Sequence, residues 1–226
     1  FQEIGNLDQE VPGNMMDVNL LAKAVLFSVF VVASLFASNL LYDKTSNFVY
    51  SRKLAHSLVG VAIFSTLWLF DSPLVPFVLS LAILLVFVAT HTREVFYGVA
   101  KRGRLSEIYF ASSCAVCFAS GWMVDPKIGV ASALFLAWGD GITGFCRWIV
   151  SKRHAKTLEG TIANFVACSL IALLIVPYWV GFCGAFIAVI AENLCGDVVK
   201  IEFIDDNLGS PLSALLVMSV LSYVFV

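Results

Sequence analysis

The chain is poor in charge: only 13% of its 226 residues are Asp, Glu, Lys or Arg, whereas 60% are apolar. Soluble domains average about 25% charged residues, so a globule of this size would have too few charges to cover its surface. Disordered chains are rich in charge and poor in apolar residues, which excludes disorder as well. The net charge of −2 offers no basic field to nucleic acid. The composition therefore predicts an all-α polytopic integral membrane protein.

Several familiar motifs are also absent. The sequence has no Asn-x-Ser/Thr acceptor, no G-x-x-x-x-G-K-[ST] loop and no H-R-D or D-F-G motif. We therefore expect neither a P-loop fold nor a protein-kinase fold. One C-x-x-C, at Cys114 and Cys117, lies in an apolar run without a second pair, and we interpret both thiols as small buried hydrophobic groups.

The first 17 residues are polar and lack the basic and apolar regions of a signal peptide. We expect residues 1–17 to be a polar N-terminal segment, partly left by processing or cloning. Residues 18–226 are expected to form a single transmembrane domain that carries any catalytic function.

About eight apolar segments approach the 20 residues that a helix needs to cross the membrane. Their predicted bounds are 18–42, 54–70, 74–91, 106–123, 127–149, 161–179, 181–195 and 209–226. Two pairs are separated only by tight turns, at Asp71-Ser72-Pro73 and at Val180-Gly181. With these spans, 12 of the 14 Lys and Arg residues fall on one side. By the positive-inside rule that side is cytoplasmic, and both termini are expected outside.

Ten of the 16 acidic residues lie on the same side as the basic ones. Acidic residues contribute little to membrane orientation, so topology does not require them there. Four clusters on this face therefore become candidates for a site at the cytoplasmic face. They are R-K-x-x-H at 52–56, Gly139-Asp140-Gly141 with Gly144 and Arg147, K-T-x-E-G-T at 156–161, and Glu192-Asn193 with Asp205-Asp206-Asn207.

Asp140 follows an apolar run that begins at Ile128, so it lies within or at the edge of the membrane. A carboxylate there is costly and is a functional candidate by default. On a helix it shares a face with Thr143, Gly144 and Arg147, and the nearby glycines would allow a ligand to approach the backbone. The alternative is an ion pair between Asp140 and Arg147 with close packing of small residues.

The other clusters also leave alternatives open. Arg52, Lys53 and His56 share a helix face, but they could simply flank a span near the headgroups. Thr157 is placed to cap a helix, whereas Lys156 beside a helix N-terminus is suited to phosphate.

Asp205 and Asp206 are adjacent carboxylates, which repel and are more stable beside a cation. Ser210-Pro211 already supplies a helix N-cap and a first-turn proline, so capping does not require the two aspartates. Mg²⁺ typically binds one or two carboxylates together with substrate phosphates.

Taken together, cations suited to a polyphosphate and carboxylates suited to Mg²⁺ lie at one membrane face. Phosphoryl transfer uses this mixture, because basic groups and metal neutralise the phosphates while a carboxylate orients or deprotonates the attacking hydroxyl. An acceptor that reaches the site from the bilayer would be a lipid alcohol.

In this order, over roughly residues 50–212, the four clusters resemble the dolichol kinase/phytol kinase family. Ser106–Phe110 resembles a weaker element of the same family. The resemblance implies CTP-dependent phosphorylation of a polyprenol such as dolichol, geranylgeraniol or phytol, giving the lipid monophosphate and CDP. The carboxylate clusters themselves make Mg²⁺ the expected cofactor. The short length is more similar to archaeal and bacterial members. The stretch after Arg147 lacks the family's usual basic, glycine-rich character.

The resemblance also implies roles for individual residues. The catalytic residues would be Asp140, Asp206, Lys156 and Glu159. The nucleotide contacts would be Arg52, Lys53, His56, Gly139, Gly141, Gly144, Arg147, Thr157 and Asn207. From the residue types themselves, we expect Mg²⁺ to be held by some of Asp140, Glu192, Asp205 and Asp206. We expect Asp206 to accept the proton of the alcohol.

The expected partners are the lipid alcohol, a nucleoside triphosphate and the membrane, with no nucleic acid; the oligomeric state stays open. One alternative function is a cytidylyltransferase that makes a CDP-activated lipid from a phosphatidic acid, because it also uses CTP, Mg²⁺ and carboxylates at the membrane. A transporter is the alternative from another class. It is less favoured because the charges gather at one face and the outer half has few.

Overall fold

The computed structural model describes residues 18–93, 95–100, 105–150, 157–195 and 205–225, and this part of the chain is helical without a β-strand. The α-helices are α1 (Val18–Thr45), α2 (Phe48–Leu69), α3 (Leu74–Thr90), α4 (Ser106–Val116), α5 (Trp122–Val124), α6 (Pro126–Leu134), α7 (Asp140–Val150), α8 (Leu158–Ile175), α9 (Tyr178–Leu194) and α10 (Asp206–Phe225). Two π-helical segments, η2 (Cys117–Gly121) and η3 (Phe135–Gly139), join α4 to α5 and α6 to α7. A 3₁₀ turn, η1 (His91–Arg93), follows α3.

Consecutive helical segments form continuous rods: α3 with η1, α4 with η2 and α5, and α6 with η3 and α7. Together with the single helices α1, α2, α8, α9 and α10, these rods correspond one to one with the predicted apolar segments. Six helical segments of the described chain are long and apolar enough to cross a membrane: Val18–Thr45, Leu74–Arg93, Ser106–Val124, Pro126–Cys146, Leu158–Ile175 and Asp206–Phe225. Two further helices are not among these six. Helix α9 is apolar but shorter, and α2 carries the charged or polar residues Arg52, Lys53 and His56 in its first half. The prediction of an all-α polytopic membrane protein is confirmed.

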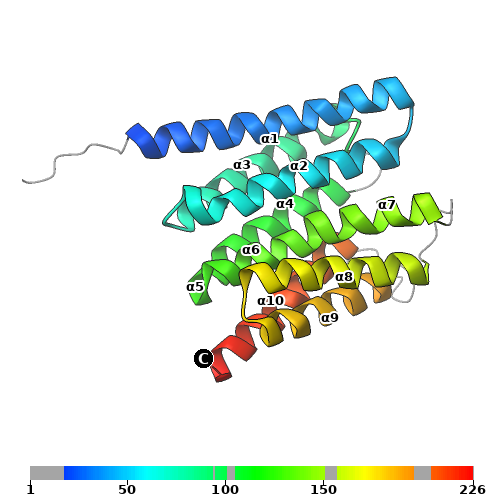
Figure 1. The fold of residues 1–226 in the computed structure, drawn as a ribbon. Coiled ribbons are helices and arrows are strands. Elements are labelled where there is room, and N and C mark those ends of the chain that lie inside the picture. Colours follow the sequence, from blue (N-terminus) through cyan, green and yellow to red (C-terminus); the bar gives the residue numbers. More distant parts are fainter. Residues whose placement is uncertain (1–17, 94, 101–104, 151–156, 196–204, 226) are drawn as a thin grey trace, which may run out of the picture.

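The rods run side by side, so their ends gather at two opposite ends of the bundle (Figure 1). The end of α1 and the start of α2 lie at the same end as the last turns of α3, α7 and α9 and the first turns of α4, α8 and α10, which the other three connections join. These are the four connections that the sequence predicts to carry most basic residues. The four candidate clusters therefore lie at one end of the molecule.

Some predicted helix boundaries are wrong. The break placed at Val180-Gly181 lies instead at Val176-Pro177, between α8 and α9. Proline has no N–H and disfavours helical geometry in the residue before it, so the chain turns there. Gly181 is buried inside α9, where a Cβ would collide with Ala172 Cβ at 2.5 Å. Glycine at this position thus permits the close packing of α9 on α8.

The core is centred on the rod formed by α6, η3 and α7. Val130, Ala133 and Leu134 have no exposed surface, and the rod packs against α2, α8 and α10. On the outer helices, large apolar side chains such as Leu85 and Leu174 are exposed. Exposed apolar side chains are expected where lipid rather than water surrounds the protein.

A prediction about stability follows from the crossing of η2 and α6. A Cβ on Gly121 would lie 2.6 Å from the amide nitrogen of Gly129, and backbone cannot move aside as a side chain can. We expect Gly121→Ala to destabilise the protein by about 1–3 kcal/mol through overpacking. Thermal unfolding in detergent measures this, with the exposed neighbour Ser120→Ala as control. An unchanged unfolding midpoint in Gly121→Ala would contradict the close crossing.

Candidate active site

Helix α2 brings three cationic or titratable side chains into the bundle. Asn47 caps the helix, because its side-chain oxygen accepts from Val49 N at 3.1 Å and from Tyr50 N at 3.3 Å. The helix thus begins at Phe48, six residues before the predicted span. Its inner face carries Arg52, Lys53 and His56, and His56 is only 4% exposed. The basic residues therefore face other helices of the bundle as well as the membrane surface.

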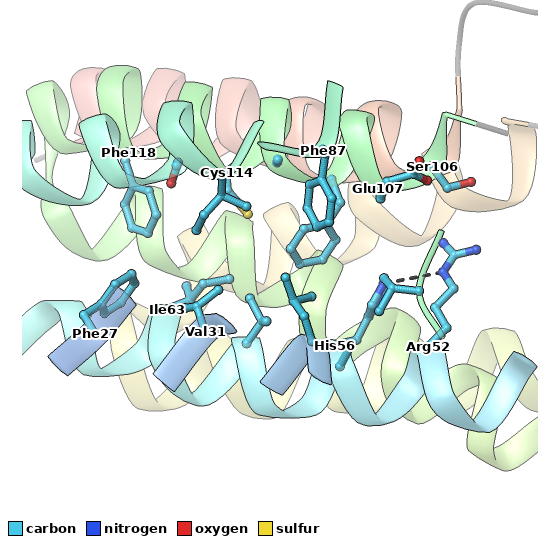
Figure 2. A pocket seen from close by; sticks show the side chains of 18 residues that line it. Phe27, Val31, Arg52, His56, Ile63, Phe87, Ser106, Glu107, Cys114 and Phe118 are labelled. Atoms are coloured by element: carbon cyan, nitrogen blue, oxygen red, sulfur yellow. Dashed lines mark hydrogen bonds between the residues drawn. The ribbon is translucent and has the colours of Figure 1, made fainter. Parts of the chain in front are cut away.

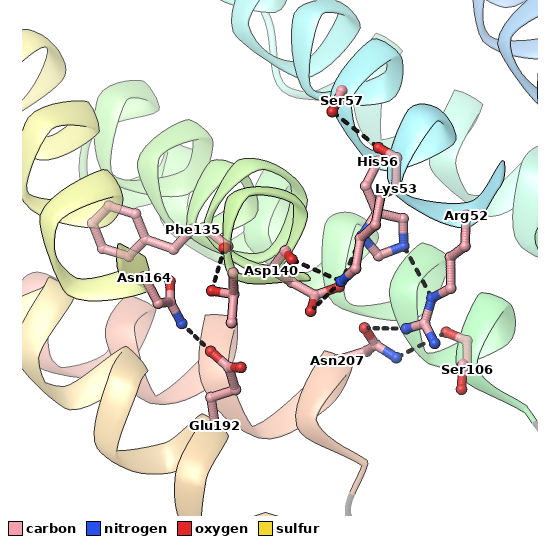
Figure 3. Close-up of polar contacts among 12 residues, drawn as sticks. Arg52, Lys53, His56, Ser57, Ser106, Phe135, Asp140, Asn164, Glu192 and Asn207 are labelled. Atoms are coloured by element: carbon pink, nitrogen blue, oxygen red, sulfur yellow. Dashed lines mark hydrogen bonds and ion pairs between the residues drawn. The ribbon is translucent and has the colours of Figure 1, made fainter. Parts of the chain in front are cut away.

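Asp140, the first residue of α7, is the centre of the site (Figure 3). Lys53 Nζ lies 2.6 Å from Asp140 Oδ1 and donates to the Asp140 backbone oxygen at 2.7 Å. His56 Nδ1 lies 3.1 Å from Asp140 Oδ2, although this contact lacks hydrogen-bond geometry. The π-helical segment η3 directly precedes Asp140, and such segments occur frequently at functional sites. The partner of this membrane carboxylate is thus Lys53, from a helix distant in sequence.

Arg52 connects this group to helix α10. Its Nη2 donates to Asn207 Oδ1 at 3.2 Å, and its Nε lies 3.5 Å from His56 Nε2. Asn207 in turn donates to Asp205 Oδ1 from its backbone N at 2.9 Å and from Nδ2 at 2.7 Å. Helices α2 and α10 therefore meet through a continuous polar chain at this end of the bundle.

The contact between Asp205 and the Asn207 backbone corrects one expectation. Asp205 caps α10, since a side-chain oxygen that accepts from the second helical N–H is the usual N-cap bond. Pro211, which was expected in the first turn, lies inside the helix that begins at Asp206. The Ser210-Pro211 argument against a capping role for Asp205 is therefore wrong. Because one Asp205 oxygen already accepts two hydrogen bonds from Asn207, it is less suited to a metal than Asp206.

Beside Asp140 lies a small polar cavity with about 200 Å³ of empty volume. It is lined by Phe135, Leu136, Asp140, Glu192, Asp206, Asn207 and Ser210. Carboxylates from α7, α9 and α10 thus share one space, as the sequence clusters predict. Glu192 is held by a hydrogen bond from Asn164 Nδ2 of α8.

Among the described residues, no three His, Cys, Asp or Glu side chains are close enough together to form a ready-made metal site. Mg²⁺ commonly uses only one or two carboxylates and takes its other ligands from phosphates and water. Asp140 and Asp206, which line the same cavity, supply oxygen donors of that kind. Their mutual repulsion would also be relieved by a cation.

The glycines around Asp140 serve packing at two of three positions. A Cβ on Gly139 would lie 2.6 Å from Asn164 Oδ1, and one on Gly144 would collide with Lys53 Cε. A Cβ on Gly141 would meet only Ser57 Oγ, at 3.7 Å, which is an ordinary contact. Gly139 and Gly144 therefore allow protein side chains, rather than a ligand, to approach the backbone.

Thr157 and Glu159 make no described hydrogen bond or ion pair with this group. Thr157 caps α8, accepting from Gly160 N at 3.3 Å, and Glu159 is exposed in the first turn of that helix. Lys156 and the Arg147 side chain lie outside the described residues, as does the polar segment 1–17.

Two polar groups were not assigned roles from the sequence. Asn164 is buried and positions Glu192; the only signal was an amide in an apolar run. Glu107 is buried at the start of α4 and lies 2.7 Å, through Oε1, from His91 Nδ1. Glu107 belongs to Ser106–Phe110, the segment that resembles a weaker element of the family. Cys114 and Cys117 are buried free thiols, as predicted.

The chain is similar to a protein of Zea mays described as "Probable phytol kinase, chloroplastic". The two are 25% identical over an alignment of 203 residues, which covers 74% of this chain and 65% of the maize protein. The match thus spans slightly less than two thirds of that relative. No protein-family model matches the chain. No solved structure matches it either.

Proposed function

We propose that the chain transfers a phosphoryl group from a nucleoside triphosphate to a lipid alcohol of the membrane, because it is similar to a probable phytol kinase of Zea mays and its motifs resemble the dolichol kinase/phytol kinase family. The observation that carries the proposal is the convergence on Asp140. Lys53 and His56 contact this carboxylate, and Asp206 and Glu192 line the same cavity. Phosphoryl transfer is catalysed mainly by positioning and by charge stabilisation, and this arrangement supplies both signs of charge beside an apolar bundle.

We assign the residues as follows. Lys53 and Arg52 contact Asp140 and Asn207 in the lining of the polar cavity, and they would offset charge on the donor phosphates. Asp140 and Asp206 would hold Mg²⁺, which supplies electrostatic stabilisation of the transferred group when bound. Asp206, whose side chain is not the cap of its helix, would accept the proton of the attacking hydroxyl. Asn207 fixes Arg52 against α10.

The donor proposed from the family resemblance is CTP. The site is proposed to face the cytoplasm, because the helix connections at its end of the bundle contain most of the Lys and Arg residues. Both termini would then lie on the opposite side.

Purified protein, supplied with γ-labelled CTP, Mg²⁺ and a prenol, is expected to form the labelled lipid monophosphate and CDP. Removal of divalent metal with EDTA is expected to abolish the transfer, and added Mg²⁺ to restore it. A cytidylyltransferase would instead release pyrophosphate and leave the γ-label out of the lipid. Release of pyrophosphate with a phosphatidic acid, or no product with any lipid alcohol, would overturn the kinase assignment. Parallel reactions with ATP test the donor separately.

A further inference from the structure

A second and larger pocket lies between α1, α2, α3 and α4 (Figure 2). Its empty volume is about 700 Å³. Nearly all of its lining is apolar, with side chains such as Val31, Ile63 and Phe87 along its length. We call it the apolar pocket, to distinguish it from the polar cavity beside Asp140.

The apolar pocket is elongated and has two unlike ends. Phe27 and Phe118 lie at one end, whereas Arg52, Ser106 and Glu107 lie at the other (Figure 2). Along α2 the lining runs from Arg52 to Ile63, and along α4 and η2 from Ser106 to Phe118. At a helical rise of about 1.5 Å per residue, each wall is about 16–18 Å long. This is a little over half of the roughly 30 Å hydrocarbon thickness of a bilayer.

The polar end of this pocket adjoins the candidate active site. Arg52 and His56 line the apolar pocket, and they also contact Asn207 and Asp140, which line the polar cavity. The two spaces are therefore separated by a layer in which the lining of the apolar pocket, Arg52 and His56, directly contacts the lining of the polar cavity. A molecule with its chain in the apolar pocket would present its head group to that layer.

Glu107 provides an independent sign of a polar head group at this end. Its side chain is only 1% exposed, and Oε1 is 2.7 Å from His91 Nδ1. Its other oxygen, Oε2, is buried and has no hydrogen-bond partner within the described residues. A buried carboxylate oxygen normally has a donor, and the hydroxyl of a bound alcohol would supply one.

We propose that the apolar pocket binds the hydrocarbon chain of the acceptor, an isoprenoid alcohol with a chain about one leaflet long. Glu107 Oε2 accepts a hydrogen bond from the hydroxyl as the alcohol docks, before the hydroxyl turns toward Asp206 for proton transfer. The proposal rests on the proposed kinase function and specifies its substrate class. Diterpene alcohols fit this length, whereas a dolichol-length polyprenol extends well beyond the pocket. Glu107 orients the hydroxyl toward the layer formed by Arg52 and His56.

The first test shortens the pocket. Cys114→Phe lies two helical turns beyond Glu107 and fills the deeper half, and Val59→Phe does so from the opposite wall. We expect at least a 10-fold loss in kcat/KM for phytol and geranylgeraniol, with the rate for geraniol little changed. Val116→Phe, on an exposed position of the same rod as Cys114, is the matched control and should keep the wild-type chain-length profile. Each variant is checked by size-exclusion chromatography and thermal unfolding.

The second test concerns the hydroxyl. Glu107→Gln keeps the shape of the side chain and is expected to raise KM for the alcohol at least 10-fold while leaving KM for the nucleotide unchanged. Equal changes in both constants would indicate a structural role and would overturn the assignment of Glu107.

Cross-linking gives a readout that does not depend on catalysis. A farnesol analogue with a diazirine at its far end is expected to label residues of η2 or the middle of α2, and excess geranylgeraniol should compete. Labelling confined to the outer surface of the bundle, or an unaltered chain-length profile in active Cys114→Phe and Val59→Phe proteins, would overturn the pocket assignment. Wild-type protein that phosphorylates no alcohol would instead overturn the proposed function itself.

Discussion

Asp140→Asn is expected to lower kcat by at least about 10²-fold, the loss typical when one electrostatic contact that stabilises the reacting groups is removed. Asp140 is the residue on which the site converges, because it contacts Lys53 and His56 and lines the polar cavity. The amide keeps the size of the side chain but loses the negative charge that balances Lys53 and would hold a cation. Initial rates of CDP formation at saturating CTP and prenol measure the effect.

The loss of charge could also weaken the fold, since removing one member of a buried ion pair leaves the other unbalanced. Thermal unfolding of the purified variant separates the two effects. Asp43→Asn is a suitable control, because Asp43 is a carboxylate at the same end of the bundle whose described partner is Tyr97, at 2.9 Å. Asp206→Asn is expected to match Asp140→Asn. Half or more of the wild-type rate in a folded Asp140→Asn protein would show that this carboxylate has no catalytic role.

Gly144→Ala is expected to lower activity by about 10²-fold through a single added methyl group. A Cβ on Gly144 would collide with Lys53 Cε and lie 2.9 Å from Lys53 Nζ. The lysine is a flexible side chain, so it can move away from the added methyl group, but its contact with Asp140 is then lost. Displacing a catalytic group by about 1 Å can cost this much in rate. Steady-state kinetics together with the unfolding midpoint test the prediction.

Gly141→Ala is the matched control on the same helix. Its Cβ would make only an ordinary contact with Ser57, and alanine is favoured over glycine in a helix by about 0.5–1 kcal/mol. We expect this variant to be fully active and slightly more stable. Loss of activity in Gly141→Ala would instead support the sequence-based idea that the glycines admit a ligand. In a Lys53→Met background, Gly144→Ala should have little further effect, because coupled residues do not act additively.

Much of the helical framework could be predicted because it depends on local sequence. The membrane requires about 20 apolar residues per helix, and the distribution of Lys and Arg places the helix connections on two sides. The predicted helix boundaries were wrong where two local signals favoured different positions. Helix α8 ends before Pro177, although the apolar pattern continues, and Asp205 rather than Ser210 caps α10. Such choices depend on a few hydrogen bonds that composition does not reveal.

The sequence alone determined the class of protein, its membrane-spanning helices, its family resemblance and the clusters at one face. It could not determine which charges pair, because contacts between α2, α7 and α10 depend on how helices distant in sequence pack together. Only the tertiary structure gave Asp140 its partners Lys53 and His56, assigned two glycines to packing, and brought Glu107 to the end of the apolar pocket. This packing brings the few charged residues of the sequence together at one site, because a buried charge is stable only beside a partner.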